Sequence, residues 1–176
     1  MVGFDFINPR PIAGRGFILK IYQDEDFFCE NRFTLEQWHN ILDGINNKIE
    51  FNNYLERYKD ILTCYVLYRD DSSEPIGMCL ILEENGWYDD CFPGEVVSVH
   101  GGGWEKSASS KYIYAKAWIR IIDYLDNLGC KILTDFNKKN ESAKHLITGT
   151  GFTYNEEINM YEYTKKLDEI KFVPNG

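Results

Sequence analysis

Apolar and polar positions along this chain of 176 residues switch between a helical period and a strand period, and these switches predict its elements. The clearest helix spans 112–128, where apolar side chains recur at intervals of three and four residues and polar side chains fill the opposite side. Gly129 follows as a typical stop. The apolar stripe of this helix consists of Ala115, Trp118, Ile119, Ile122 and Leu125.

Three further helices are predicted from the same period. The first covers 34–42, where Thr34 and Gln37 form a capping-box pattern, and the second covers 48–61. The third is short and follows Asn140, whose side chain can accept a hydrogen bond from an orphan helix N–H. Its apolar face is Ala143, Leu146 and Ile147, and Gly149 and Gly151 fit the left-handed positions that end a helix.

Runs of β-branched and aromatic residues predict the strands of a sheet. A polar turn over 69–74 is predicted to join two of them in a hairpin, and residues 9–14 are expected to be loop. The order is strand, two helices, three strands, helix, strand, helix and two strands, which indicates one α/β domain over 1–176. The predicted strands are 16–22, 64–68, 75–82, 95–100, 131–136, 152–157 and 160–165.

Composition narrows the classes of function. The chain is 44% hydrophobic and 15% aromatic, which is typical of a folded globular protein. Its net charge of -9 argues against nucleic acid as a partner, because phosphate backbones attract clustered Lys and Arg. The same charge suits a cationic partner such as an amine. His39, His100 and His145 are far apart in the sequence, so no metal site is expected.

The cysteines and the apolar runs bear on the compartment. The five cysteines are odd in number and contain no C-x-x-C pair, so free thiols in a reducing compartment are the simplest interpretation. No apolar run reaches 18 residues, and no basic segment followed by an apolar run opens the chain. We therefore expect a cytoplasmic protein with no membrane partner.

The segment 140–152 carries a known pattern. It reads Asn-x-x-Ala-x-x-Leu-x-x-x-x-Gly-Phe and resembles the C-terminal signature of the GCN5-related N-acetyltransferase superfamily. The order of elements is similar to that family along nearly the whole chain. The resemblance implies a mixed, mostly antiparallel sheet flanked by helices. It also implies that the strands at 95 and 131 are parallel neighbours that diverge at their carboxyl ends.

The resemblance further implies acetyl-coenzyme A as acyl donor, bound where those two strands diverge. In the family, the pantetheine arm pairs with backbone groups of the earlier strand. The pyrophosphate lies on N–H groups at the start of the following helix, a favourable site for an anion. Carried onto this chain, the donor would contact Ser98, Val99, His100, Gly101, Ser107, Ala108, Ser109, Ser110, Lys111 and Tyr112, together with Asn140 and Ala143.

Two positions depart from the family pattern. The usual Gln/Arg-x-x-Gly-x-Gly/Ala loop is missing, and 107–114 (Ser-Ala-Ser-Ser-Lys-Tyr-Ile-Tyr) stands in its place, with small residues, hydroxyls and flanking lysines. Ile147 occupies the position where the family often has a Tyr that protonates the leaving thiolate. Tyr154, Tyr161 or Tyr163 could replace it. Lys138, Lys139 and Lys144 either face the adenosine phosphate or form a solvated turn.

Glu95 and His100 are the candidate general bases. Several family members carry a Glu on this strand, and alternation puts Glu95 on one face with Val97 and Val99. Apolar neighbours would raise the pKa of such a carboxyl and suit it to base catalysis. The alternatives are an exposed Glu at a strand start and a His in a turn that is bonded to the backbone. On the acceptor side, the acidic and aromatic loop 83–91 suits a cationic amine or is simply solvated.

Two functions stay open from the sequence. One is an acyl-CoA-dependent N-acyltransferase acting on an amine of a small molecule or protein by direct attack. The other is a non-catalytic module of the same fold, favoured by the missing loop and the missing Tyr. The run His-Gly-Gly-Gly-Trp over 100–104 resembles the oxyanion loop of some hydrolases. No Gly-x-Ser-x-Gly segment accompanies it, so we interpret the glycines as allowing a bulge or close backbone approach at the end of the strand.

Overall fold

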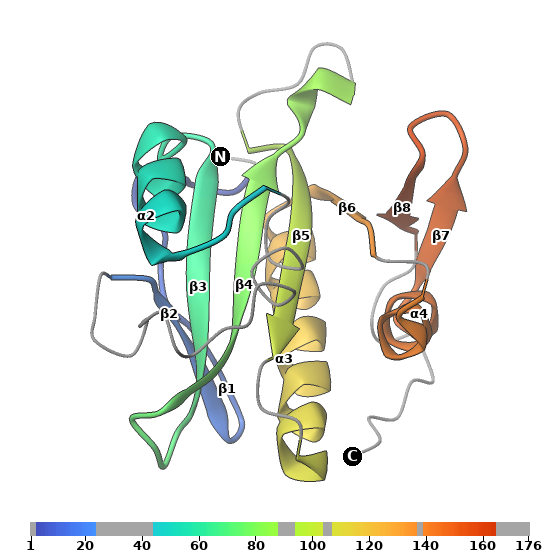
Figure 1. Ribbon diagram of the computed structural model, residues 1–176. Helices are drawn as coiled ribbons and strands as arrows, with labels where there is room; N and C mark the ends of the chain where they lie inside the picture. The colour runs from blue at the N-terminus through green and yellow to red at the C-terminus, as the bar shows by residue number, and fades with distance from the viewer. Residues whose placement is uncertain (1–2, 24–43, 88–93, 104–106, 137–138, 165–176) are drawn as a thin grey trace.

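The computed structural model describes residues 3–23, 44–87, 94–103, 107–136 and 139–164. These residues form one curled sheet of eight strands with helices on both faces (Figure 1). The strands are β1 (Ile12–Gly14), β2 (Phe17–Ile21), β3 (Leu62–Arg69), β4 (Pro75–Glu83), β5 (Val96–Gly103), β6 (Lys131–Thr134), β7 (Phe152–Asn155) and β8 (Met160–Tyr163). The helices are α2 (Lys48–Arg57), α3 (Ala108–Asn127) and α4 (Glu141–Gly149), with a 3-10 turn at Asn85–Trp87.

The strand order is β1-β2-β3-β4-β5-β6-β8-β7, and every pair is antiparallel except β5 with β6. This confirms the predicted mixed, mostly antiparallel sheet. The parallel pair follows from its connection, since α3 crosses from the end of β5 to the start of β6. Within the described ranges, no helix is both long enough and apolar enough to span a bilayer.

Alternation along the strands separates two apolar layers. On one face, Phe51 of α2 packs with Leu62, Cys64, Met78 and Leu80 of the sheet. On the other face, α3 and α4 cover a larger core. That core includes Val97, Val99, Ile121, Ile122, Leu125, Ile132 and Ile147. Even-numbered residues of β5 therefore point to the α2 face, and odd-numbered ones point to the α3 face.

Several predicted boundaries differ from the observed ones. Residues 9–14 were expected to be loop, yet Ile12–Gly14 pairs with β2, because a tight turn before Phe17 brings the two segments together. Helix α3 begins at Ala108, four residues before the prediction, since the Ser107 side chain caps it. Gly149 is the last residue of α4, so only Gly151 has the left-handed conformation predicted for both. The helix predicted over 34–42 lies outside the described residues.

The strands β5 and β6 diverge as predicted. Their parallel pairing extends only from Val96 opposite Lys131 to Ser98 opposite Leu133. Beyond that point β5 continues to Gly103 with β4 as its one neighbour among the described strands, whereas β6 ends at Thr134 and pairs with β8 (Figure 1). The carboxyl half of β5 consequently has one edge that no described strand covers.

Candidate functional site

The uncovered edge of β5 begins at Val99. The Thr134 hydroxyl donates to the Val99 carbonyl over 2.6 Å and so closes the last position of the ladder with a side chain. Backbone groups of alternate strand residues share an edge, so Gly101 directs its N–H and C=O to the same side as Val99. Gly101 thus presents the donor and acceptor that an amide-containing ligand needs.

Two of the three glycines at the end of β5 allow close packing. A Cβ on Gly101 would come within 2.9 Å of the Met78 carbonyl, and one on Gly103 within 2.0 Å of the Tyr114 ring. Gly102 differs, because no described atom lies within 4 Å of the place its Cβ would occupy. Close approach of β4 explains Gly101 and close approach of α3 explains Gly103, as the sequence favoured over an oxyanion loop.

The start of α3 gathers hydroxyls and a guanidinium. The Ser107 Oγ accepts from the Ser110 N–H over 3.1 Å, and Ser110 is completely buried. Arg69, at the end of β3, donates to the Ser109 Oγ over 2.8 Å and also to the Ser110 Oγ. A helix start provides orphan N–H groups and a positive dipole. Arg69 adds a fixed cation there, and the sequence missed it because it lies 40 positions before Ser109.

His100 stands in a chain of hydrogen bonds on the α2 face of the sheet. Its Nε2 lies 2.9 Å from the Oγ of Ser98, and that hydroxyl donates to the Oε1 of Glu84 over 2.8 Å. Ser98 is fully buried, and His100 is partly buried. Burial lowers the pKa of His100, although the carboxylates of Glu84 and Asp135 act in the opposite direction. The neutral imidazole is therefore the form present near neutral pH.

This lowered pKa of His100 has a consequence for stability. The unfolded chain binds a proton at the ordinary pKa of 6.5, whereas the folded chain resists it, so stability is lost as pH falls below about 6.5. We expect the urea midpoint to fall from pH 7 to pH 5.5, and His100→Gln to make this fall shallower. An unchanged pH dependence in the variant would contradict the buried neutral state.

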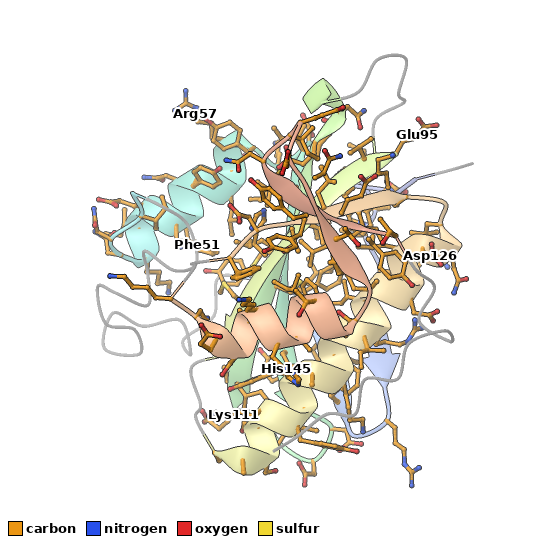
Figure 2. The ribbon with its side chains drawn as sticks, turned by 90° about the vertical axis from the view of Figure 1, so that its right-hand side faces the viewer. Phe51, Arg57, Glu95, Lys111, Asp126 and His145 are labelled. Carbon is orange, nitrogen blue, oxygen red and sulfur yellow. The ribbon has the colours of Figure 1, made fainter. Side chains whose placement is uncertain are left out.

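Glu95 lies at the other end of β5. It precedes the first strand residue, and its carbonyl accepts from the Lys131 N–H over 2.7 Å, where β5 and β6 are still together. Figure 2 shows Glu95 far from Lys111 at the start of α3. Val97 and Val99, which alternation placed with it, are buried on the α3 side. His100 is thus nearer than Glu95 to the diverging part of the sheet.

Helix α4 is capped as the sequence predicted, with the Asn140 Oδ1 accepting from the Ala143 N–H over 3.0 Å. Ile147 is 5% exposed and belongs to the core, so its position is filled by packing. Among the three candidate tyrosines, register places Tyr161 opposite Thr134, next to the divergence of β5 and β6. The Tyr154 hydroxyl instead bonds the Asn159 side chain in the turn between β7 and β8.

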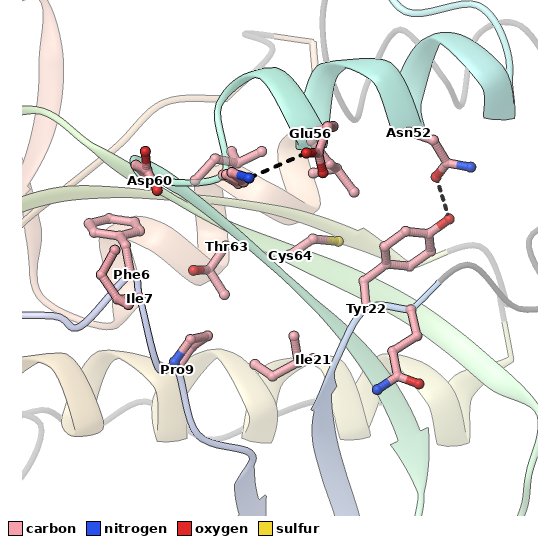
Figure 3. Close-up of a pocket in the computed structure, with 14 residues that line it drawn as sticks. Phe6, Ile7, Pro9, Ile21, Tyr22, Asn52, Glu56, Asp60, Thr63 and Cys64 are labelled. Atoms are coloured by element: carbon pink, nitrogen blue, oxygen red, sulfur yellow. Dashed lines mark hydrogen bonds and ion pairs between the residues drawn. The ribbon is translucent and has the colours of Figure 1, made fainter.

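A separate groove of ≈ 510 Å³ lies between α2, the end of β2 and the start of β3 (Figure 3). Its walls combine aromatic and carboxylate groups, and the Tyr22 hydroxyl donates to the Asn52 side chain over 2.6 Å. Strands β3 and β4 separate it from β5. The sequence did not predict this groove. Of the acidic loop predicted at 83–91, residues 88–91 lie outside the described ranges, and Glu84 is the member that reaches His100 through Ser98.

The cysteines, the possible metal ligands and the first residues of α3 complete the set of candidate groups. Over the described ranges no three His, Cys, Asp or Glu side chains cluster as they would around a metal ion. Burial raises the pKa of the Cys79 and Cys130 thiols to about 12, so neither is a nucleophile near neutral pH. Cys91, Lys106 and Lys138 lie outside the described residues. Lys111 and Tyr112 are exposed on the first turn of α3.

Several solved structures with a similar architecture are acetyltransferases. An aminoglycoside acetyltransferase, AAC(6')-Ib, in complex with ribostamycin and coenzyme A is 16% identical over 88% of this chain and 96% of its own, with a TM-score of 0.57. A GCN5-related N-acetyltransferase from Brucella melitensis is 13% identical over 96% and 84%, with a TM-score of 0.61. A ribosomal-protein-S5-alanine acetyltransferase from Vibrio fischeri is 14% identical over 92% and 99%, with a TM-score of 0.57.

No protein-family model matches the chain, and no curated protein matches it. Identities this low establish the fold alone. The chain has the fold of the GCN5-related N-acetyltransferases, as its C-terminal signature and its order of elements predicted.

Proposed function

Starting from this acetyltransferase fold, we propose that the protein is an acyl-CoA-dependent N-acyltransferase that transfers an acetyl group to an amine. The observation that carries the proposal is the neutral His100 on β5, the strand whose carboxyl half has one edge that no described strand covers. A general base and a backbone edge able to bind the acyl donor thus belong to one short segment of β5. Direct transfer needs chiefly proximity and a proton acceptor.

The residues present fit coenzyme A at two places. The β5 edge at Val99–Gly101 offers amide groups to the pantetheine arm, except that Thr134 already occupies the Val99 carbonyl. The start of α3 offers N–H groups, exposed hydroxyls and the Arg69 guanidinium to the pyrophosphate. This set replaces the family's glycine-rich loop. Asn140 and Ala143 of α4 are proposed as a further contact with coenzyme A, as the C-terminal signature implies.

The acyl donor is a substrate that supplies an activated thioester. The amine nitrogen forms a C–N bond with the acyl carbon, the C–S bond breaks, and the thiolate leaves with that electron pair. The proton lost by the amine passes to His100 or, in the alternative, to Glu95. Tyr161 is the tyrosine best placed by register to return a proton to the thiolate. Because a thiolate is a good leaving group, we expect the lack of a Tyr at position 147 to lower the rate less than loss of the base would.

The acceptor is proposed to be a small cationic amine. The net charge of -9 favours a cation. Burial, then Tyr58 and then the charge of Glu84, raises the pKa of the Tyr54 phenol. Tyr54 and Tyr58 have their ring centroids 4.6 Å apart on α2. Carboxylate and aromatic groups on this face suit an ammonium group. Structures of similar fold contain the aminoglycosides ribostamycin and kanamycin, which is consistent with a small-molecule amine.

Acetyl-CoA is expected to raise the melting temperature of the protein, because a ligand selective for the native state stabilises it. Arg69→Ala should weaken this binding about tenfold or more, since a charge-assisted contact to phosphate contributes roughly 1.5–3 kcal/mol. Thermal-shift titration measures both. Arg57→Ala is the matched control, because Arg57 packs over the Tyr58 ring on α2, away from α3.

A non-catalytic module of the same fold is the second candidate, favoured by the buried Ile147 at the tyrosine position. No stabilisation of the wild type by millimolar acetyl-CoA would support this module and contradict the transferase. Equal weakening by Arg69→Ala and Arg57→Ala would instead remove the start of α3 as the phosphate site.

A further inference from the structure

Three side chains from two strand segments form a line on the α2 face. Glu84 directly follows β4, Ser98 lies within β5, and His100 lies two residues further on the same face. The register pairs Leu82 with Ser98 and Leu80 with His100, so the end of β4 runs beside this part of β5. The distances along the line are 2.8 Å and 2.9 Å, both within the hydrogen-bond range.

The chemistry of the three groups decides which atom donates and which accepts in each hydrogen bond. A carboxylate accepts hydrogen bonds and has no proton to donate, so the single hydroxyl proton of Ser98 goes to Glu84. The Ser98 Oγ then has only lone pairs left for His100. In a neutral imidazole one nitrogen carries the proton, and here that nitrogen must be Nε2. Nδ1 is left as the basic nitrogen.

Charges around His100 act on its affinity for a proton. Glu84 from the end of β4 and Asp135 from the segment after β6 both raise its pKa, with Glu84 the larger of the two, and burial opposes them. On the α2 side, the charge of Glu84 adds to burial and Tyr58 in raising the pKa of Tyr54. Removal of the Glu84 charge should therefore lower the pKa of His100 further.

We propose that Glu84 and Ser98 are positioning residues that act through His100, fixing its proton on Nε2 so that Nδ1 takes the proton of the attacking amine. This inference rests on the proposed transferase function. Its structural half, the choice of tautomer, does not require catalysis and can be measured on the protein alone. The two halves can therefore fail separately.

The first experiment reads the tautomer in the unliganded full chain by ¹⁵N NMR of the imidazole nitrogens. His39→Gln and His145→Gln identify the signals of His100 among the three histidines. The expected result in the wild type is a protonated Nε2 and an unprotonated Nδ1. A proton on Nδ1, or an even mixture of tautomers, would overturn the proposal whether or not the protein transfers acyl groups.

Glu84→Gln tests whether the carboxylate of Glu84 fixes the donor and acceptor of these hydrogen bonds. An amide can donate as well as accept, so Ser98 is no longer forced to donate to residue 84, and both tautomers of His100 should become populated. The NMR titration should also give a lower His100 pKa than in the wild type. Glu83→Gln is the matched control, because it removes the same charge one residue away, where alternation directs the side chain to the opposite face. Equal effects of the two variants would contradict a role for Glu84.

Ser98 supplies the second pair of variants. Ser98→Ala removes the hydroxyl from a fully buried site, whereas Ser98→Thr keeps it. In an acetyl-transfer assay we expect Ser98→Ala to lower kcat roughly tenfold with little change in KM for acetyl-CoA, and Ser98→Thr to recover most of it. In Glu84→Gln the acid limb of the kcat profile should move to lower pH. If the tautomer is as expected but no acceptor amine is acetylated, the transferase function fails and the positioning of His100 stands.

Discussion

Replacing His100 by glutamine is expected to lower kcat for acetyl transfer by about 10²-fold or more, the usual contribution of a general base. Gln is similar in size and can still donate to Ser98, but it cannot take up a proton near neutral pH. Binding of acetyl-CoA should survive, since the β5 backbone and the start of α3 are unchanged. Steady-state kinetics and the thermal-shift titration measure the two effects separately.

Glu95→Gln is the comparison variant, because Glu95 is the other candidate base on the same strand. We expect it to change kcat far less than His100→Gln, since Glu95 lies where β5 and β6 are still paired. A large loss in Glu95→Gln with none in His100→Gln would reverse the assignment. No loss in either variant would mean that positioning alone carries the transfer.

The second large effect concerns stability. Gly94→Ala is expected to lower the free energy of unfolding by about 3 kcal/mol or more, because its backbone has φ +86 and its Cβ would lie 2.2 Å from the Phe4 carbonyl oxygen. The Phe4 N–H donates to the Gly94 carbonyl over 2.9 Å, and Phe4 is 2% exposed. An added methyl group must push this buried N-terminal segment away from the sheet. Urea denaturation measures the loss.

Gly44→Ala is the matched control for backbone strain. Gly44 has φ +84, almost the same conformation, but no described atom lies within 4 Å of its missing Cβ. We expect it to cost about 1 kcal/mol, the price of the left-handed conformation alone. Equal losses in the two variants would show that Phe4 moves freely and that the close approach has no energetic weight.

Much of this fold was determined by local sequence patterns. The period of 3.6 over α3 and the Asn140 cap of α4 depend on neighbouring residues, so the chain specified these helices directly. Alternation and turn chemistry likewise specified the β3–β4 hairpin. The parallel pairing of β5 and β6 followed from one helical crossover and the handedness rule. The short strand β1 was missed because three residues carry too little pattern to distinguish them from loop.

The candidate site was determined only in part by the sequence. His100 and Ser107–Tyr112 became candidates through the resemblance of the chain to the acetyltransferase family, which implies a donor bound between the strands at 95 and 131. The contact of Arg69 with α3 joins residues 40 apart, and the contact of Glu84 with Ser98 joins residues 14 apart. Such contacts depend on strand register and on which face each side chain occupies. The sequence therefore determined the elements and the residue types of the candidate site. Only the tertiary structure decided which side chains lie within hydrogen-bond distance of one another, because strand register and the packing of distant segments set the distances between them.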